Sequence, residues 1–148
     1  MNKRCLAAIG MLVFCFMMLT AGAGWCWKVD NGTITDTATG LVWLKNADCF
    51  GKKDWNSAMS SAQSLSSGSC GLSDGSKAGQ WRLPTKDELK AIFSKKNGFT
   101  NVQSGLYWSS TTIAYDTDSA WIVSMLYGDV YNDFKTYNYY VWPVRAGQ

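Results

Sequence analysis

Histidine is absent from the 148-residue chain, and Glu88 is its only glutamate. Histidine is the usual general base of enzymes and a common zinc ligand, so its absence removes the most frequent acid–base and metal chemistry. Glu88 stands three residues after Thr85, where it suits a helix cap, and no candidate nucleophile has an activating base nearby in the sequence. We therefore expect a protein that is not an enzyme and that needs no cofactor.

Long apolar runs are also scarce, and the one that exists lies at the start of the chain, from Leu6 to Leu19. A basic pair precedes it and the small residues Ala21-Gly22-Ala23 follow it, which is the pattern of a secretory signal peptide. About 14 apolar residues fall short of the roughly 20 that a membrane-spanning helix needs. We expect a signal peptide at residues 1–23, one domain at residues 24–148, and export to the periplasm, the cell surface or the medium with no membrane span after cleavage.

Net charge is small as well. The formal charge of +3 falls to +1 once the two basic residues of the leader are removed, and aspartates outnumber basic residues in the tail. A nearly neutral exported domain is not expected to bind nucleic acid. A polyanion would have to use the front half of the domain, where most of the lysines lie: Lys45, Lys52, Lys53, Lys86, Lys90, Lys95 and Lys96.

Three cysteines remain after the leader: Cys26, Cys49 and Cys70. Because exported proteins meet an oxidising compartment, one disulfide is expected, and a bond from Cys49 to Cys70 would join the two ends of an intervening helix. Zinc is the alternative for neighbouring cysteines, but the chain has neither a CxxC pair nor a histidine. No metal site is predicted, and Cys26 is left as a free, capped or intermolecular thiol.

The start of the domain alternates turn signals with short apolar runs. The Asn31-Gly32 dipeptide predicts a tight hairpin turn between strands at 27–29 and 33–35. A second turn at 36–40 leads into a buried strand at Leu41–Leu44.

Two helices are predicted in the middle of the chain. Apolar residues at helical spacing from Trp55 to Leu65 follow the capping residue Asp54. A serine- and glycine-rich loop at 64–79 separates them from a second helix, which Thr85 and Glu88 begin as a capping box and Asn97-Gly98 ends.

Beyond residue 105 the pattern changes from helical to alternating. In the predicted strand Trp121, Val123 and Met125 face the core, while Ala120, Ile122 and Ser124 face outward. A turn at Tyr127-Gly128 follows, and Val130 is expected to continue the sheet within a contact loop at 129–138. A strand at 141–144 closes the sheet. Two helices among short, mainly antiparallel strands predict an α+β domain, with Trp43, Trp81, Trp108 and Trp121 in its core.

The tail is rich in tyrosine, serine, asparagine and aspartate. Tyrosine supplies a large contact area with few rotatable bonds, and the small polar side chains supply adaptable hydrogen bonds, as in antibody combining sites. Positions 129–137 lack the alternating apolar residues that would bury a strand. The composition therefore favours a binding surface over a purely structural sheet, although tyrosine also serves cross-strand packing.

Four motifs stand in order along the domain: NGTITD with TGLVW at 31–43, WRLPT with Glu88-Leu89 at 81–89, YWSS at 107–110, and VWPVR at 141–145. In these motifs the chain resembles the bacterial Lcl C-terminal domain family. The resemblance implies a C-type lectin-like fold, with two helices packed on a mainly antiparallel sheet of short strands with long loops. The collagen-like adhesins of this family bind sulfated polysaccharides, which implies an alternative function through the front-half lysines, but the chain has no Gly-X-Y repeat.

The tail also resembles the variable proteins of diversity-generating retroelements, in which asparagine codons of a template are randomised during copying. That resemblance implies a variable ligand-binding face for an unknown protein or glycan at a cell surface, and it leaves oligomer formation open. The residue types that such copying generates mark the candidate binding positions Ile113, Tyr115, Asp116, Asp118, Ser119, Ile122, Ser124, Tyr127, Asp129, Tyr131, Asn132, Asp133, Phe134, Tyr137, Asn138, Tyr139 and Trp142.

Two further resemblances lack their functional residues. The run from Arg82 to Thr85 is similar to formylglycine-generating oxidases, but those enzymes need paired cysteines late in the domain and no cysteine follows Cys70. The calcium-binding motifs of animal C-type lectins are missing too. Aspartates at 116 and 118, or at 129 and 133 beside Asn132, would offer oxygen ligands to calcium, but solvated acidic loops explain them equally well.

Overall fold

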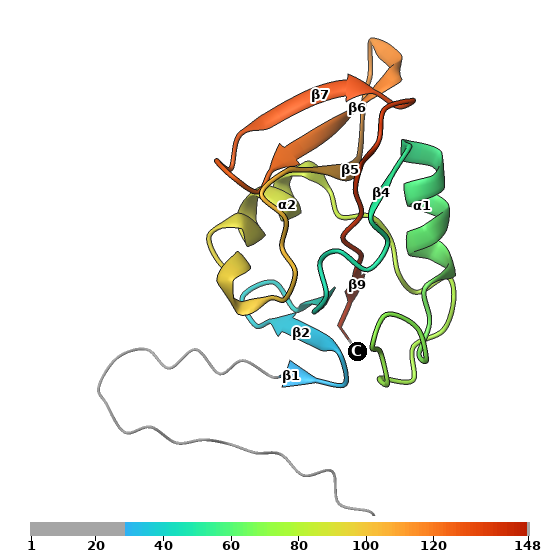
Figure 1. Cartoon of the computed structure of the whole chain (residues 1–148), viewed down its shortest axis with the longest axis vertical. Helices are drawn as coiled ribbons and strands as arrows, with labels where there is room; N and C mark the ends of the chain where they lie inside the picture. Colours follow the sequence, from blue (N-terminus) through green and yellow to red (C-terminus); the bar gives the residue numbers. More distant parts are fainter. Residues whose placement is uncertain (1–28, 148) are drawn as a thin grey trace, which may run out of the picture.

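The computed structural model describes residues 29–147, which form an α+β domain of two α-helices and two small sheets (Figure 1). The helices are α1 (Trp55–Ser64), α2 (Lys86–Phe93) and the 3-10 helix η1 (Lys96–Gly98). The strands are β1 (Val29–Asp30), β2 (Thr33–Asp36), β3 (Leu41–Leu44), β4 (Lys52–Lys53), β5 (Leu106–Ile113), β6 (Asp116–Ser124), β7 (Val130–Phe134), β8 (Tyr139–Tyr140) and β9 (Val144–Ala146). The expected α+β class is confirmed, and the arrangement is consistent with the lectin-like fold that the resemblance implies.

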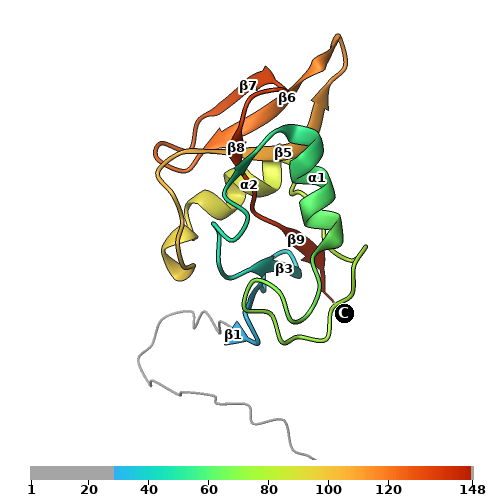
Figure 2. The same ribbon diagram turned by 45° about the vertical axis from the view of Figure 1, so that its right-hand side comes forward.

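The strands divide into two sheets. The first sheet has the order β1-β2-β3-β9 and the second the order β4-β8-β5-β6-β7, and Figures 1 and 2 show them at opposite ends of the domain. Paired strands run antiparallel except β5 and β8, which are parallel where Tyr107 meets Tyr140. The chain passes from one sheet to the other between β8 and β9. Residues 141–143 are therefore a buried connector, whereas the sequence predicted a strand there.

The first hairpin forms at the predicted turn. Asn31 and Gly32 have φ values of 49° and 85°, the left-handed backbone that a two-residue hairpin turn requires. Gly32 has a second reason to be glycine, because a Cβ there would collide with the carbonyl oxygen of Gly71. The loop after α1 packs directly on this turn, and its Ser73 N–H donates to the Asn31 carbonyl at 2.9 Å.

Side chains cap both helices at the predicted residues. The Ser57 N–H donates to the Asp54 carboxylate at 3.0 Å. The Glu88 N–H donates to the Thr85 hydroxyl at 3.2 Å and the Thr85 N–H donates to the Glu88 carboxylate at 2.8 Å, which completes the capping box. The second helix ends at Phe93, earlier than predicted, and η1 forms where the sequence placed its end.

The predicted disulfide between Cys49 and Cys70 is present, with the two Cα atoms 5.6 Å apart. It ties the loop after α1 to the segment that follows β3. Further along this loop, Asp74 accepts a hydrogen bond from Arg145 of β9 at 3.0 Å, and Ser76 accepts one from the Trp81 indole at 2.9 Å. The loop lacks regular secondary structure, yet these bonds hold it against the rest of the domain.

The core consists of two clusters on opposite faces of the second sheet. Tyr107 and Val123 belong to the cluster that includes the buried side of α2, whereas their neighbours Trp108 and Ile122 belong to the cluster that includes the buried side of α1. Successive residues of a strand point to opposite faces. Each helix therefore covers one face of β5 and β6, and both faces are apolar.

This double coverage corrects the predicted orientation of β6. Ala120, Ile122 and Ser124 were expected to face solvent, but all three are buried. Trp121 was expected in the core and is only half-buried. The prediction assumed one solvated face, which does not exist along most of this strand.

Val130 continues the sheet as expected, but the strand is longer than predicted: residues 131–134, expected in a loop, also belong to β7 and pair with β6. The signal peptide, Cys26 and the first part of the predicted strand at 27–29 lie outside the described residues. Within residues 29–147 none of the helices combines the length and apolar character needed to cross a membrane.

Candidate functional site

Large apolar side chains that remain exposed are confined to one part of the described chain. Six of them are between 47% and 88% exposed, and all six lie between residues 115 and 137: Tyr115, Leu126, Tyr127, Tyr131, Phe134 and Tyr137. They occupy the β5–β6 hairpin tip, the β6–β7 turn, β7 itself and the turn after it. We call these six residues the apolar rim, because they lie on β7 and on the turns of the second sheet, whose strands Figure 1 shows.

The rim exists because β7 is an edge strand with few buried residues. On β5 and β6 both faces are covered, whereas Tyr131, Asn132 and Phe134 of β7 remain exposed. Soluble monomers seldom concentrate exposed aromatic residues in one region without a binding function. Tyrosine is also among the residue types enriched where binding energy is concentrated.

Twelve of the seventeen candidate binding residues are accessible. The exposed ones are Tyr115, Asp118, Tyr127, Asp129, Tyr131, Asn132, Phe134, Tyr137 and Asn138, and the half-buried ones are Asp116, Asp133 and Tyr139. Polar side chains therefore accompany the apolar rim on the same strands and turns. This combination gives a surface both apolar contact area and hydrogen-bonding groups.

The other five candidates are buried and correct the prediction: Ile113, Ser119, Ile122, Ser124 and Trp142 are each no more than 5% exposed. Trp142 lies in the main core cluster, where its indole donates to the Leu44 carbonyl at 2.8 Å. The residue types that template copying generates include ordinary core residues, so residue type alone does not distinguish a core position from a ligand-contacting one. In the folded domain these five side chains offer almost no surface to a ligand.

A hollow of about 480 Å³ opens beside the rim. Phe134 forms its apolar wall, and the polar residues around it are Asn56, Thr117, Asp118, Lys135 and Thr136. The Lys135 ammonium lies 4.5 Å from the centre of the Trp55 ring, which holds this part of the hollow against α1. Asn56 comes from α1, far from the tail in sequence, and nothing in its sequence context marked it as part of this site.

Electrostatic contacts order the tyrosines of the tail. The Tyr139 hydroxyl donates to the Asp133 carboxylate at 2.5 Å, and burial together with this bond raises the pKa of Tyr139 to about 12. The nearby charge of Asp129 raises the pKa of Tyr131, whose hydroxyl donates to that carboxylate at 3.3 Å. Both phenols are therefore neutral hydrogen-bonding groups at physiological pH.

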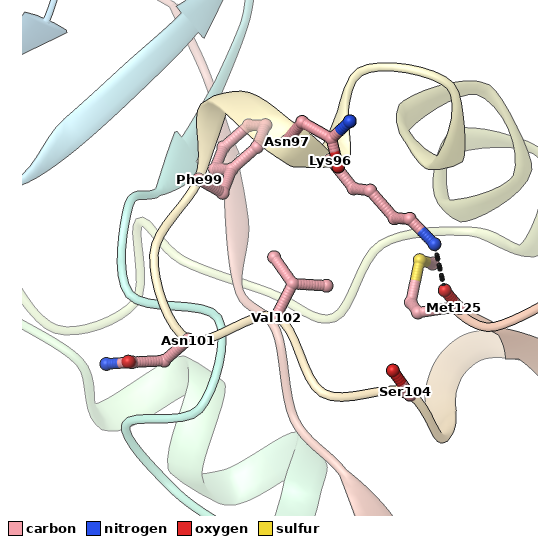
Figure 3. A pocket seen from close by; sticks show the side chains of 7 residues that line it. All are labelled: Lys96, Asn97, Phe99, Asn101, Val102, Ser104 and Met125. Atoms are coloured by element: carbon pink, nitrogen blue, oxygen red, sulfur yellow. Dashed lines mark hydrogen bonds between the residues drawn. The ribbon is translucent and has the colours of Figure 1, made fainter.

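A second hollow, of about 570 Å³, lies between η1, the loop that follows it and the end of β6 (Figure 3). Phe99, Val102 and Met125 supply apolar walls, and Asn97, Asn101 and Ser104 supply polar groups around it. The Lys96 ammonium donates to the backbone carbonyl of Met125, so its charge is already directed at this wall (Figure 3). None of the seventeen tail candidates lines this hollow, although Lys96, one of the lysines considered for polyanion binding, does.

The lysines proposed for polyanion binding are largely engaged within the protein. Lys95 pairs with Asp36 at 2.8 Å and Lys86 with Asp87 at 3.0 Å. Lys52 lies 5.1 Å from the Tyr140 ring centre and Lys96 lies 4.3 Å from that of Phe93. Four of the seven lysines thus already have a local partner.

The acidic side chains of the tail were considered as oxygen ligands for a metal ion. Among residues 29–147 no group of three or more histidine, cysteine, aspartate or glutamate side chains is placed to hold a metal ion. Asp116 accepts a bond from the Asp118 N–H at 3.1 Å, which is a local turn contact.

Comparison with known proteins agrees with the sequence motifs. The profile of the Lcl C-terminal domain matches residues 32–145, which is most of the chain and nearly all of the described structure. A search of curated proteins returns no match. By this match, the chain belongs to the Lcl C-terminal domain family.

Proposed function

We propose that this protein is an exported, non-catalytic recognition domain that binds a protein or glycan through the apolar rim and the hollow beside Phe134. The observation that carries the proposal is the confinement of all six exposed large apolar residues of the described chain to residues 115–137. Exposing them costs free energy in the isolated domain, and covering them with a partner would recover it.

The framework beneath the rim suits this role. β5 and β6 are packed on both faces, so the edge strand and its turns rest on a rigid support. Binding groups on a preorganised scaffold lose little conformational entropy when a partner binds. The scaffold and the contact surface are thus separate sets of residues.

Site-specific photo-crosslinking tests the proposal without knowledge of the ligand. A benzophenone amino acid would replace Tyr131 or Tyr137 on the rim, and Lys90, on the exposed side of α2, would carry the same group as a matched control. Irradiation of the native producing cells should give the same adduct from both rim positions and no such adduct from the control. Equal labelling at all three positions, or no adduct from the rim, would contradict a recognition role for this surface.

We extend the proposal to diversification of the rim by a retroelement. The nine exposed candidates can change with little loss of core packing, whereas the five buried ones and the half-buried Tyr139, which packs against Trp108, cannot. A reverse-transcriptase gene and an asparagine-codon template repeat are expected beside the gene. Related copies should vary at exposed positions such as Tyr131 and Phe134 and keep Ile122 and Trp142. Absence of both genetic elements would refute diversification and leave the recognition proposal standing.

A further inference from the structure

β7 has an open edge. Within the described residues it pairs with β6 alone and ends the order of its sheet. At its two ends the Asp129 carbonyl and the Lys135 N–H bond to β6, at 2.9 Å and 2.8 Å. Bonded and non-bonded residues alternate along an antiparallel pair. The intervening Val130, Asn132 and Phe134 therefore direct their backbone N–H and C=O groups away from β6.

One end of that edge is already closed by the chain itself. The Phe134 N–H donates to the Asp133 carboxylate at 2.8 Å, and the Phe134 carbonyl accepts from the Tyr137 N–H at 3.0 Å. The outward groups of Val130 and Asn132 have no such partner in the described part of the chain. The open edge thus offers two donors and two acceptors, which is the set that one short added strand would use.

Side chains beside this edge alternate between acidic and aromatic. Asp129, Tyr131 and Asp133 share one face of β7 because they are two residues apart. One oxygen of the half-buried Asp133 carboxylate accepts from the outward Phe134 N–H, and the other accepts from the Tyr139 hydroxyl, so the carboxylate lies beside the open edge and is already hydrogen-bonded. Neither aspartate forms an ion pair within residues 29–147. An added strand would therefore meet two carboxylates that are hydrogen-bonded to tyrosines but not neutralised by a basic side chain, one on either side of the exposed Tyr131 ring.

We infer that β7 accepts an extended segment of a partner protein as an added antiparallel strand, with basic side chains four residues apart opposite Asp129 and Asp133. An aromatic or β-branched residue between them would pack on Tyr131, since such cross-strand pairs are favourable. The inference rests on the proposed recognition role and specifies its partner. Main-chain hydrogen bonds would hold the strand, and charge would select it.

A second copy of this chain is a poorer occupant. If two β7 strands paired through both Val130 and Asn132, each Val130 would lie opposite the Asn132 of the other copy. Asp129 of one copy would then lie directly opposite Asp133 of the other. Like charges placed opposite each other in a sheet destabilise the pair, and such charges are a known protection of edge strands against self-association.

Two blocked peptides test the inference by NMR on the nitrogen-15-labelled protein, produced from the full chain. The first peptide is Thr-Lys-Val-Tyr-Val-Lys-Thr, and the control has glutamate in place of both lysines. The lysine peptide should shift the amide signals of Val130 and Asn132 and slow their exchange with solvent, and the shifts should weaken as salt is added. Shifts elsewhere in the protein, or equal shifts with the glutamate peptide, would overturn the inference.

Two variants at Asn132 separate the backbone edge from the side chains. Asn132→Pro removes an outward donor that β6 does not use, and proline is tolerated on edge strands in this orientation. It should weaken the lysine peptide about tenfold or more, whereas Asn132→Thr keeps the N–H and should bind as the parent does. Asp129→Asn should weaken binding about two- to fivefold.

Two other results would count against the inference. Equal binding by Asn132→Pro and Asn132→Thr, with unchanged amide spectra away from β7, would exclude strand addition. Concentration-dependent dimerisation that Asn132→Pro abolishes would assign the edge to a second copy. If rim crosslinking succeeds while the peptide leaves the Asn132 amide unaffected, the recognition proposal survives and only strand addition fails.

Discussion

Removal of the disulfide between Cys49 and Cys70 should lower the stability of the domain substantially. The two cysteines are 21 residues apart, and the chain-entropy relation gives about 3 kcal/mol at 25 °C for a loop of that length. For a domain of roughly 120 residues this corresponds to a fall in Tm of roughly 10–15 °C. The loop keeps its bond from Asp74 to Arg145 and its contact with the first hairpin, so the variant should still fold.

The measurement is thermal unfolding of a Cys49→Ala, Cys70→Ala double variant, followed by circular dichroism with and without reductant. Both the variant and its parent would carry Cys26→Ser, so that no third thiol can exchange. Reductant should lower the Tm of the parent towards that of the double variant and leave the double variant unchanged. A double variant within about 3 °C of the parent would refute the reasoning, because the loop would then be held by its non-covalent contacts alone.

Three further changes probe the turn, the core assignment and the acid response. Gly128 has a φ of 81°, and a Cβ there would lie 2.8 Å from a ring carbon of Phe93. Gly128→Ala should therefore lower the free energy of unfolding, measured in urea, by about 1–3 kcal/mol. An unchanged free energy would contradict this turn conformation. Trp142→Ala in the core should lower the free energy of unfolding by about 3–5 kcal/mol, whereas Phe134→Ala on the rim should lower it by no more than about 0.5 kcal/mol. Equal losses would contradict the assignment of Trp142 to the core and Phe134 to the surface. Burial alone would raise the pKa of Asp36, but bonds from Lys95 and its own turn lower it below the ordinary value of 3.8. The unfolded chain then binds more protons than the folded one in acid. The stability that ionised Asp36 contributes is present above pH 3.8 and should be lost as the pH falls through the lower pKa of the folded state. Asp36→Asn should flatten the dependence of the free energy of unfolding on pH in this range. An unchanged slope would assign the dependence to other carboxylates.

Local interactions were predictable from the sequence because all their partners lie within a few residues. The turn at Asn31-Gly32, the cap at Asp54 and the capping box of Thr85 and Glu88 each appear as expected. The disulfide was predictable for a different reason, since only three cysteines remain once a leader is removed.

The proposed binding surface was predictable only in part. Tyrosine-rich composition located the region, and most of the accessible candidates lie on β7 and its turns. Leu126, Lys135 and Asn56 were missed. Lys135 is not among the residue types that template copying generates, whereas Leu126 is among them but was not singled out. Asn56 reaches the hollow only because α1 packs beside the second sheet.

By itself the sequence determined the α+β class, the family, the turns, the helix caps and the disulfide, because each depends on residue types at short or fixed spacing. Only the tertiary structure decided which tail residues are core and which are surface. A strand pattern of period two assigns faces correctly when one face meets solvent, and here α1 and α2 cover both faces of β6. That double coverage buries Ile122, while Trp142 is buried because the connector between β8 and β9 runs through the main core cluster. β7 has an open edge and exposed aromatic side chains because it stands at the end of its sheet.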